Sequence, residues 1–66
     1  MTGIQKAVDA AKTQQALADQ LGVSQQMISK WVKRGYAPAE RAVEIEAQYG
    51  VSRRELIKPS LRSLLE

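Results

Sequence analysis

The chain has 66 residues and a net charge of +3 at pH 7, with 44% hydrophobic and 26% charged residues. This length allows one small domain, over residues 1–66, and the composition is that of a globular protein. The sequence contains no cysteine, no histidine and no long apolar run, so it predicts no disulfide, metal site, cofactor, signal peptide or membrane span. We expect a cytoplasmic protein that is not an enzyme and takes no small-molecule ligand.

The first predicted helix covers Thr2 to Ala11. Thr2 and Gln5 have the spacing of a capping box, in which each side chain bonds the backbone of the other residue. Ile4 and Val8 lie one turn apart on an apolar face. We expect this helix to cover the core, and we assign it no functional residue.

Residues 14–33 predict two helices joined by a tight turn. Thr13 is suited to cap the first helix, and Gly22 can end it in a left-handed conformation. Ser24 is suited to cap the second helix, which we place at residues 25–33. Two helices joined in this way form a helix-turn-helix.

The second helix of this motif has an apolar and a polar face at about 100° per residue. We expect Ile28 and Trp31 to pack in the core, and Met27 and Val32 to lie in the core or near its edge. Glutamine presents a donor and an acceptor that match the adenine edge, and lysine suits guanine or a phosphate. A solvated helix face is the alternative, but the complete turn pattern favours contact with DNA. The polar face consists of Gln25, Gln26, Ser29, Lys30 and Lys33.

The charge is distributed unevenly along the chain. Between Gln25 and Tyr36 there is no acidic residue, whereas Lys30, Lys33 and Arg34 are present. From residue 37 onward, basic and acidic residues cancel. A surface that faces phosphates has this character, although cations near a helix C-terminus are also favoured by the helix dipole.

The second half of the chain predicts further helices. Pro38 suits the first position of a helix over residues 38–49, and Ser52 and Glu55 form a capping box for a short fifth helix that begins at Arg53. A half that contains strands is the alternative, but the lack of alternating β-branched residues favours helix.

The C-terminal tail covers residues 59–66. Pro59 should stop or kink the fifth helix. The leucines that follow are too few to form a stable isolated helix, and we regard them as a candidate dimer contact. They are Leu61, Leu64 and Leu65.

The helix-turn-helix contains a set of small, apolar and polar residues at fixed spacing, namely Gln14, Leu17, Ala18, Leu21, Gly22, Val23, Ile28 and Trp31. In this spacing the chain resembles the Cro and repressor proteins of lambdoid phages, above all the YdaS-like and all-helical Cro branch. The resemblance covers most of residues 13–57. It implies an all-α, five-helix, lambda-repressor-like fold and a transcriptional repressor that binds double-stranded operator DNA as a homodimer. An antitoxin or adaptor that acts through protein contacts is the alternative within the same family.

The resemblance also implies roles for individual residues. At Tyr36 and Ala37 the chain departs from the family, which often has an arginine or another polar residue there, so we assign no phosphate contact to Tyr36. The start of the second motif helix should meet base edges in the major groove through Gln25, Gln26, Ser29 and Lys30. Phosphate contacts are expected from Gln14, Gln15, Ser24, Lys33 and Arg34.

Overall fold

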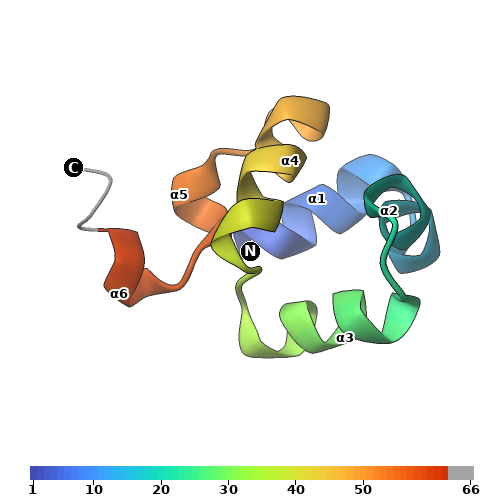
Figure 1. Cartoon of the computed structure of the whole chain (residues 1–66), viewed down its shortest axis with the longest axis horizontal. Helices are drawn as coiled ribbons and strands as arrows, with labels where there is room; N and C mark the ends of the chain where they lie inside the picture. Colours follow the sequence, from blue (N-terminus) through green and yellow to red (C-terminus); the bar gives the residue numbers. More distant parts are fainter. Residues whose placement is uncertain (63–66) are drawn as a thin grey trace.

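The computed structural model describes residues 1–62, and within that range the secondary structure is entirely helical. Figure 1 shows α3 along one edge of the molecule, with α2 at one end of it and α5 and α6 toward the other end. No helix within residues 1–62 has the length and apolar character needed to cross a lipid bilayer. The helices are α1 (Gly3–Ala11), α2 (Gln14–Leu21), α3 (Gln25–Arg34), α4 (Ala39–Tyr49), α5 (Arg53–Leu56) and α6 (Pro59–Arg62).

The core draws one large, fully buried side chain from each of the first five helices. These side chains have no exposed area, so each removes its whole apolar surface from water. Smaller residues such as Ala18 and Ala42 allow the helices to approach one another closely. The five fully buried side chains are Ile4, Leu17, Ile28, Ile45 and Leu56. This core confirms the all-α fold expected from the sequence.

The predicted caps fix the helix-turn-helix. The Thr13 hydroxyl oxygen accepts a hydrogen bond from the Ala16 N–H at 3.0 Å, and the Ser24 hydroxyl oxygen accepts one from the Met27 N–H at 3.2 Å. Each cap satisfies a backbone donor that has no partner within its own helix. As a result, α2 has the predicted bounds, and α3 begins at the predicted residue.

The turn between α2 and α3 is a Schellman motif. Gly22 has φ +70°, a left-handed conformation that costs glycine little. The N–H groups of Val23 and Gly22 donate back to the carbonyl oxygens of Ala18 and Asp19, at 3.0 and 3.4 Å. Val23 then packs against the core. These contacts set the direction in which α3 leaves the turn.

Three helix boundaries differ from the predictions by one residue. α1 begins at Gly3, because Thr2 is its N-cap. α3 continues to Arg34, and α4 begins at Ala39 rather than at Pro38. Pro38 has ψ 149°, which is extended and not helical, so it lies at the N-cap rather than at the first helical position. Its carbonyl oxygen still accepts the first hydrogen bonds of α4, from the Arg41 and Ala42 N–H groups.

The two predicted capping boxes form only in part. The Thr2 hydroxyl oxygen accepts a hydrogen bond from the Gln5 N–H, as expected, whereas the Ser52 hydroxyl oxygen accepts one from the Arg54 N–H and not from the Glu55 N–H. The side chains of Gln5 and Glu55, which should have bonded back to the N-cap residues, bind elsewhere. Gln5 Nε2 donates to Asp9 Oδ1, one turn along α1. Glu55 Oε1 instead pairs with Lys6 Nζ at 2.6 Å, which joins α5 to α1.

The segment from Pro59 to Arg62 corrects the prediction of five helices. Pro59 does not merely end α5, because it begins a four-residue helix, α6. Proline suits this position, where a backbone N–H would have no helical partner. Leu61 is 37% exposed on α6. The other leucines of the predicted dimer contact, Leu64 and Leu65, lie outside the described residues.

Candidate nucleic-acid interface

The inner face of α3 is anchored in the core. Ile28 is fully buried and Trp31 is 3% exposed, while Val32 is half-buried and packs against the same cluster. Trp31 therefore acts as a core residue. Burial of these side chains holds the helix rigidly and determines which of its faces meets solvent.

The outer face of α3 carries the residues predicted to contact bases. Gln25, Gln26 and Lys30 are exposed, and Ser29 is half-buried between them and the core. The side chains of Gln25, Gln26, Lys30 and Lys33 form no hydrogen bond or ion pair with any residue in the described range 1–62. Their amide and ammonium groups are therefore available to an external partner.

The cations of α3 differ from several others in the molecule. The ion pairs found within residues 1–62 join α1 to α5, join α4 to α5, or lie within α4, and they are Lys6–Glu55, Arg53–Glu46 and Arg41–Glu44. In contrast, Lys30, Lys33 and Arg34 have no carboxylate partner in the described chain. Three cations without counter-charges on one helix favour a polyanionic partner for that face.

The residues predicted to contact phosphates differ in exposure and in whether their side chains already form a hydrogen bond. Lys33 is exposed, and the Ser24 hydroxyl caps α3 while its own hydrogen can still be donated. Gln14 is half-buried at the start of α2. Gln15 is exposed, but its Nε2 donates to Asp19 Oδ1 at 2.8 Å. An approaching phosphate therefore competes with Asp19 for Gln15.

Arg34 is held at the end of α3 by the residue two positions on. Its guanidinium carbon lies 4.5 Å from the centre of the Tyr36 ring, and its Nε donates to the Tyr36 carbonyl oxygen at 3.1 Å. We predicted no phosphate contact for Tyr36 itself. Its ring and carbonyl oxygen instead hold the side chain of Arg34, which is a predicted phosphate contact.

Of the two predicted positions for Met27, in the core or near its edge, the structure shows the edge. Met27 is 44% exposed, whereas Ile28 and Trp31 on the same helix are buried. At about 100° per residue, Met27 and Val32 lie about 70° to either side of the midpoint of the buried face. The protein covers the Val32 side and leaves the Met27 side open, which periodicity alone does not reveal.

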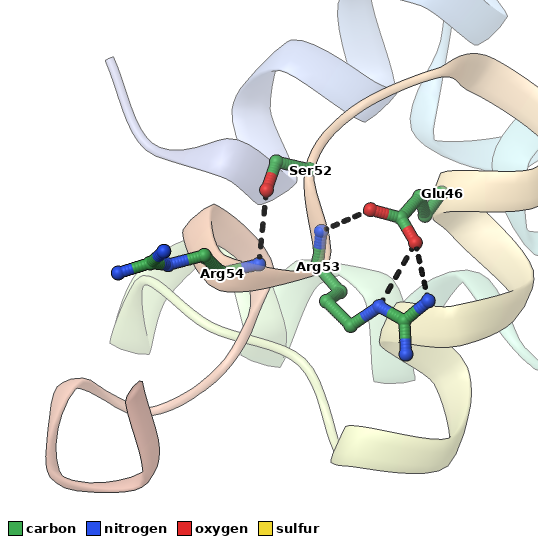
Figure 2. A pocket seen from close by; sticks show the side chains of 4 residues that line it. All are labelled: Glu46, Ser52, Arg53 and Arg54. Atoms are coloured by element: carbon green, nitrogen blue, oxygen red, sulfur yellow. Dashed lines mark hydrogen bonds and ion pairs between the residues drawn. The ribbon is translucent and has the colours of Figure 1, made fainter. Parts of the chain in front are cut away.

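A second cluster of polar residues lies where α4 meets α5 (Figure 2). Arg53 Nε donates to Glu46 Oε1 at 2.9 Å, and the Arg53 backbone N–H donates to Glu46 Oε2 at 3.0 Å. The backbone hydrogen bond is the main cause of a lowered pKa at Glu46, followed by the hydrogen bond from the Arg53 side chain. The carboxylate therefore compensates for a cation at a helix N-terminus, which is otherwise an unfavourable position.

This geometry defines a class of protein. A helical domain with a rigidly anchored helix-turn-helix, and with a cationic, amide-bearing outer face, is a small DNA-binding regulator of the helix-turn-helix class. The family described as "Bacterial toxin YdaS" matches residues 4–59. The chain therefore belongs to the YdaS-like family. The matched range includes most of the N-terminal helix α1 as well as the helix-turn-helix.

Two solved structures of Cro proteins are similar to the chain. One is the Cro protein from the putative prophage element Xfaso 1 of Xylella fastidiosa strain Ann-1, with 41% identity and a TM-score of 0.82 over 92% of this chain and 95% of that one. The other is the solution structure of XPH1, a hybrid sequence of Xfaso 1 and Pfl 6, two Cro proteins with different folds; it has 40% identity and a TM-score of 0.72 over 88% of each chain. No curated protein matches. These similarities confirm the resemblance to prophage Cro proteins.

Proposed function

We propose that the protein is a Cro-type prophage repressor that binds double-stranded DNA sequence-specifically by inserting α3 in the major groove. The main support is the outer face of α3, where the side chains of Gln25, Gln26, Lys30 and Lys33 have no partner in residues 1–62 while the inner face is buried. The similar Cro proteins from prophage elements point to the same role. Repression then requires only occupation of a promoter in the host cytoplasm, and no chemical step.

The dimensions of α3 suit the major groove. Its ten residues span about 15 Å, and a helix with its side chains is roughly 10–12 Å wide, close to the 12 Å width of the groove. In this arrangement Gln25 and Gln26 lie in the first turn, where recognition helices meet base edges. Lys33 and Arg34, in the last turn, approach the phosphates at the groove rim.

We propose that two copies bind together. One domain offers few phosphate contacts, and a second half-site is the simplest way to raise affinity. Two recognition helices then enter successive major grooves about 34 Å apart on a pseudo-palindromic operator. The leucines of the tail are the proposed subunit contact.

Selection of bound fragments from random duplex DNA tests this function. We expect enrichment of a pseudo-palindromic sequence whose half-sites are one helical turn apart. Binding should weaken steeply as salt rises from about 50 to 200 mM, because phosphate contacts release counterions. Failure to enrich any sequence at low salt would reject the proposal.

The description of the matched family favours one other candidate. Its name refers to a bacterial toxin, which suggests an adaptor or a toxin–antitoxin component that acts through protein contacts. Docking through the apolar tail should change little with salt, unlike DNA binding. Expression of the protein with a Gln25→Ala/Gln26→Ala change separates the two: a repressor loses its effect on the selected operator, whereas a protein that acts through its tail keeps its effect on the cell.

A further inference from the structure

Met27 is an apolar side chain at the edge of the buried face of α3, where that face borders the polar one. It is 44% exposed, and of the large hydrophobic residues exposed within residues 1–62 it is the one that lies on α3. The same helix buries Ile28 and Trp31, so exposure of Met27 does not arise from a loosely packed helix. Residues 1–62 therefore leave a large part of this side chain accessible to a partner.

The position of Met27 relates it to the candidate DNA contacts. It follows Gln26 in the first turn of α3, and at about 100° per residue it lies on the same flank as Lys30 and Arg34. The major groove is about as wide as a helix and roughly 8.5 Å deep, so both flanks of an inserted first turn come near base edges. A long, unbranched side chain on that flank can reach them.

The chemistry of the methionine side chain favours one group among those that bases present in the major groove. Thymine is the base that presents a methyl group in the major groove, and the other base edges there offer hydrogen-bond donors and acceptors. Methionine has no hydrogen to donate and only a weakly accepting sulfur, and its flexible thioether adapts well to apolar surfaces. We propose that Met27 is a specificity-determining residue that packs against the C5 methyl group of a thymine in each half-site; this rests on the proposed function.

Replacement of thymine by deoxyuridine tests this contact, because it removes only the methyl group. The test uses the duplex recovered by selection, with each thymine of the half-site replaced in turn. For the wild-type chain we expect Kd to rise about fourfold per half-site at one thymine position, as for loss of one buried methyl-sized group. Uracil at the other thymine positions should change Kd less.

Two variants assign the effect to Met27. Met27→Ala should bind the thymine duplex about fourfold more weakly per half-site and should no longer distinguish thymine from uracil at that position. Val43→Ala shortens another exposed aliphatic residue, on α4, and should retain the full uracil effect. Thermal denaturation and sedimentation of both variants should match the wild type.

The possible results separate this inference from the proposed function. If no duplex is enriched by selection, the proposed function fails. If a duplex is enriched but contains no thymine in its half-site, or if Met27→Ala keeps the same uracil penalty at every position, Met27 reads no methyl group although the protein binds DNA. Weaker binding by Met27→Ala that accompanies loss of the dimer would place Met27 in a subunit contact and would also overturn the inference.

Discussion

The guanidinium group of Arg34 lies over the ring of Tyr36, 4.5 Å from its centre, and a 3.1 Å hydrogen bond from Arg34 Nε to the Tyr36 carbonyl oxygen fixes its orientation. The two terminal nitrogens of Arg34 have no hydrogen-bond partner among residues 1–62. A cation held in this way loses little conformational entropy when it binds a phosphate. Tyr36 therefore acts as a positioning residue for the last turn of α3.

Substitution of Tyr36 should weaken DNA binding without altering sequence preference. An exposed cation–π contact is worth about 0.5–1 kcal/mol, so Tyr36→Leu should raise Kd about two- to fivefold on all sequences. Tyr36→Phe retains the ring and is the matched control, with affinity close to the wild type. Titrations of a cognate and an unrelated duplex measure both effects. Equal losses for the Leu and Phe variants would show that the ring does not position Arg34.

Substitutions on the outer face of α3 should separate base reading from phosphate binding. Gln25→Ala or Gln26→Ala should cost about 1–3 kcal/mol on the cognate duplex and relax base preference, because each removes a bidentate amide. Lys33→Ala should weaken binding to all sequences alike and reduce the salt dependence. Competition binding with single-base variants of the operator gives the measurement. Uniform losses for all three variants would remove the assignment of the glutamines to base edges.

Local signals were enough to predict the helix-turn-helix. Thr13 and Ser24 supply capping oxygens, and Gly22 supplies the left-handed turn, so the bounds of α2 and the start of α3 follow from neighbouring residues. The burial of Ile28 and Trp31 follows in the same way from helical periodicity. The contacts of the outer face with DNA remain predictions.

Contacts between distant segments could not be predicted. Lys6 and Glu55 are 49 positions apart, and Glu46 reaches Arg53 only because α4 and α5 meet at an angle that no local pattern specifies. The open flank at Met27 depends likewise on where the neighbouring helices end. The capping-box pattern at Ser52 and Glu55 was misleading for this reason, because the Glu55 side chain pairs with Lys6 on α1 and not with the backbone at its own helix terminus.

The contact between Glu46 and Arg53 should make stability depend on pH. The folded chain holds the pKa of Glu46 below its ordinary value, so the unfolded chain takes up the proton at a higher pH. The stabilisation is therefore complete above the ordinary pKa of glutamate, about 4.3, and is lost as the pH falls through the lowered value.

Thermal denaturation between pH 7 and pH 3 measures this effect. Glu46→Gln should melt below the wild type at neutral pH, and the difference should shrink as the solution becomes acidic. The difference at neutral pH should be small, since the contact is exposed to solvent. Glu40→Gln removes a carboxylate from the same helix away from this contact and controls for the change in net charge. If the melting temperatures of wild type and Glu46→Gln differed by the same amount at every pH from 7 to 3, the lowered pKa of Glu46 would be contradicted.

The close approach of α1 to α5 predicts an unusual response to alanine at Gly3. Within a helix, alanine is normally more stable than glycine by about 0.5–1 kcal/mol. At Gly3, however, an added Cβ would lie 2.8 Å from Glu55 Cβ and would overlap the Glu55 backbone carbonyl. Because backbone cannot move aside as a flexible side chain can, α5 would have to shift, together with the ion pair between Lys6 and Glu55.

We therefore expect Gly3→Ala to destabilise the domain by about 1–3 kcal/mol, the usual cost of overpacking. In a domain of this size each kcal/mol lowers the melting temperature by roughly 4–8 °C, which differential scanning calorimetry resolves readily. Ala10→Gly, at an exposed site on the same helix, is the control and should lower stability by about 0.5–1 kcal/mol through helix propensity alone. If Gly3→Ala instead raised the melting temperature, α1 and α5 would not pack backbone against backbone at this point, and Gly3 would be an ordinary helical position where the smaller residue is simply the less stable choice.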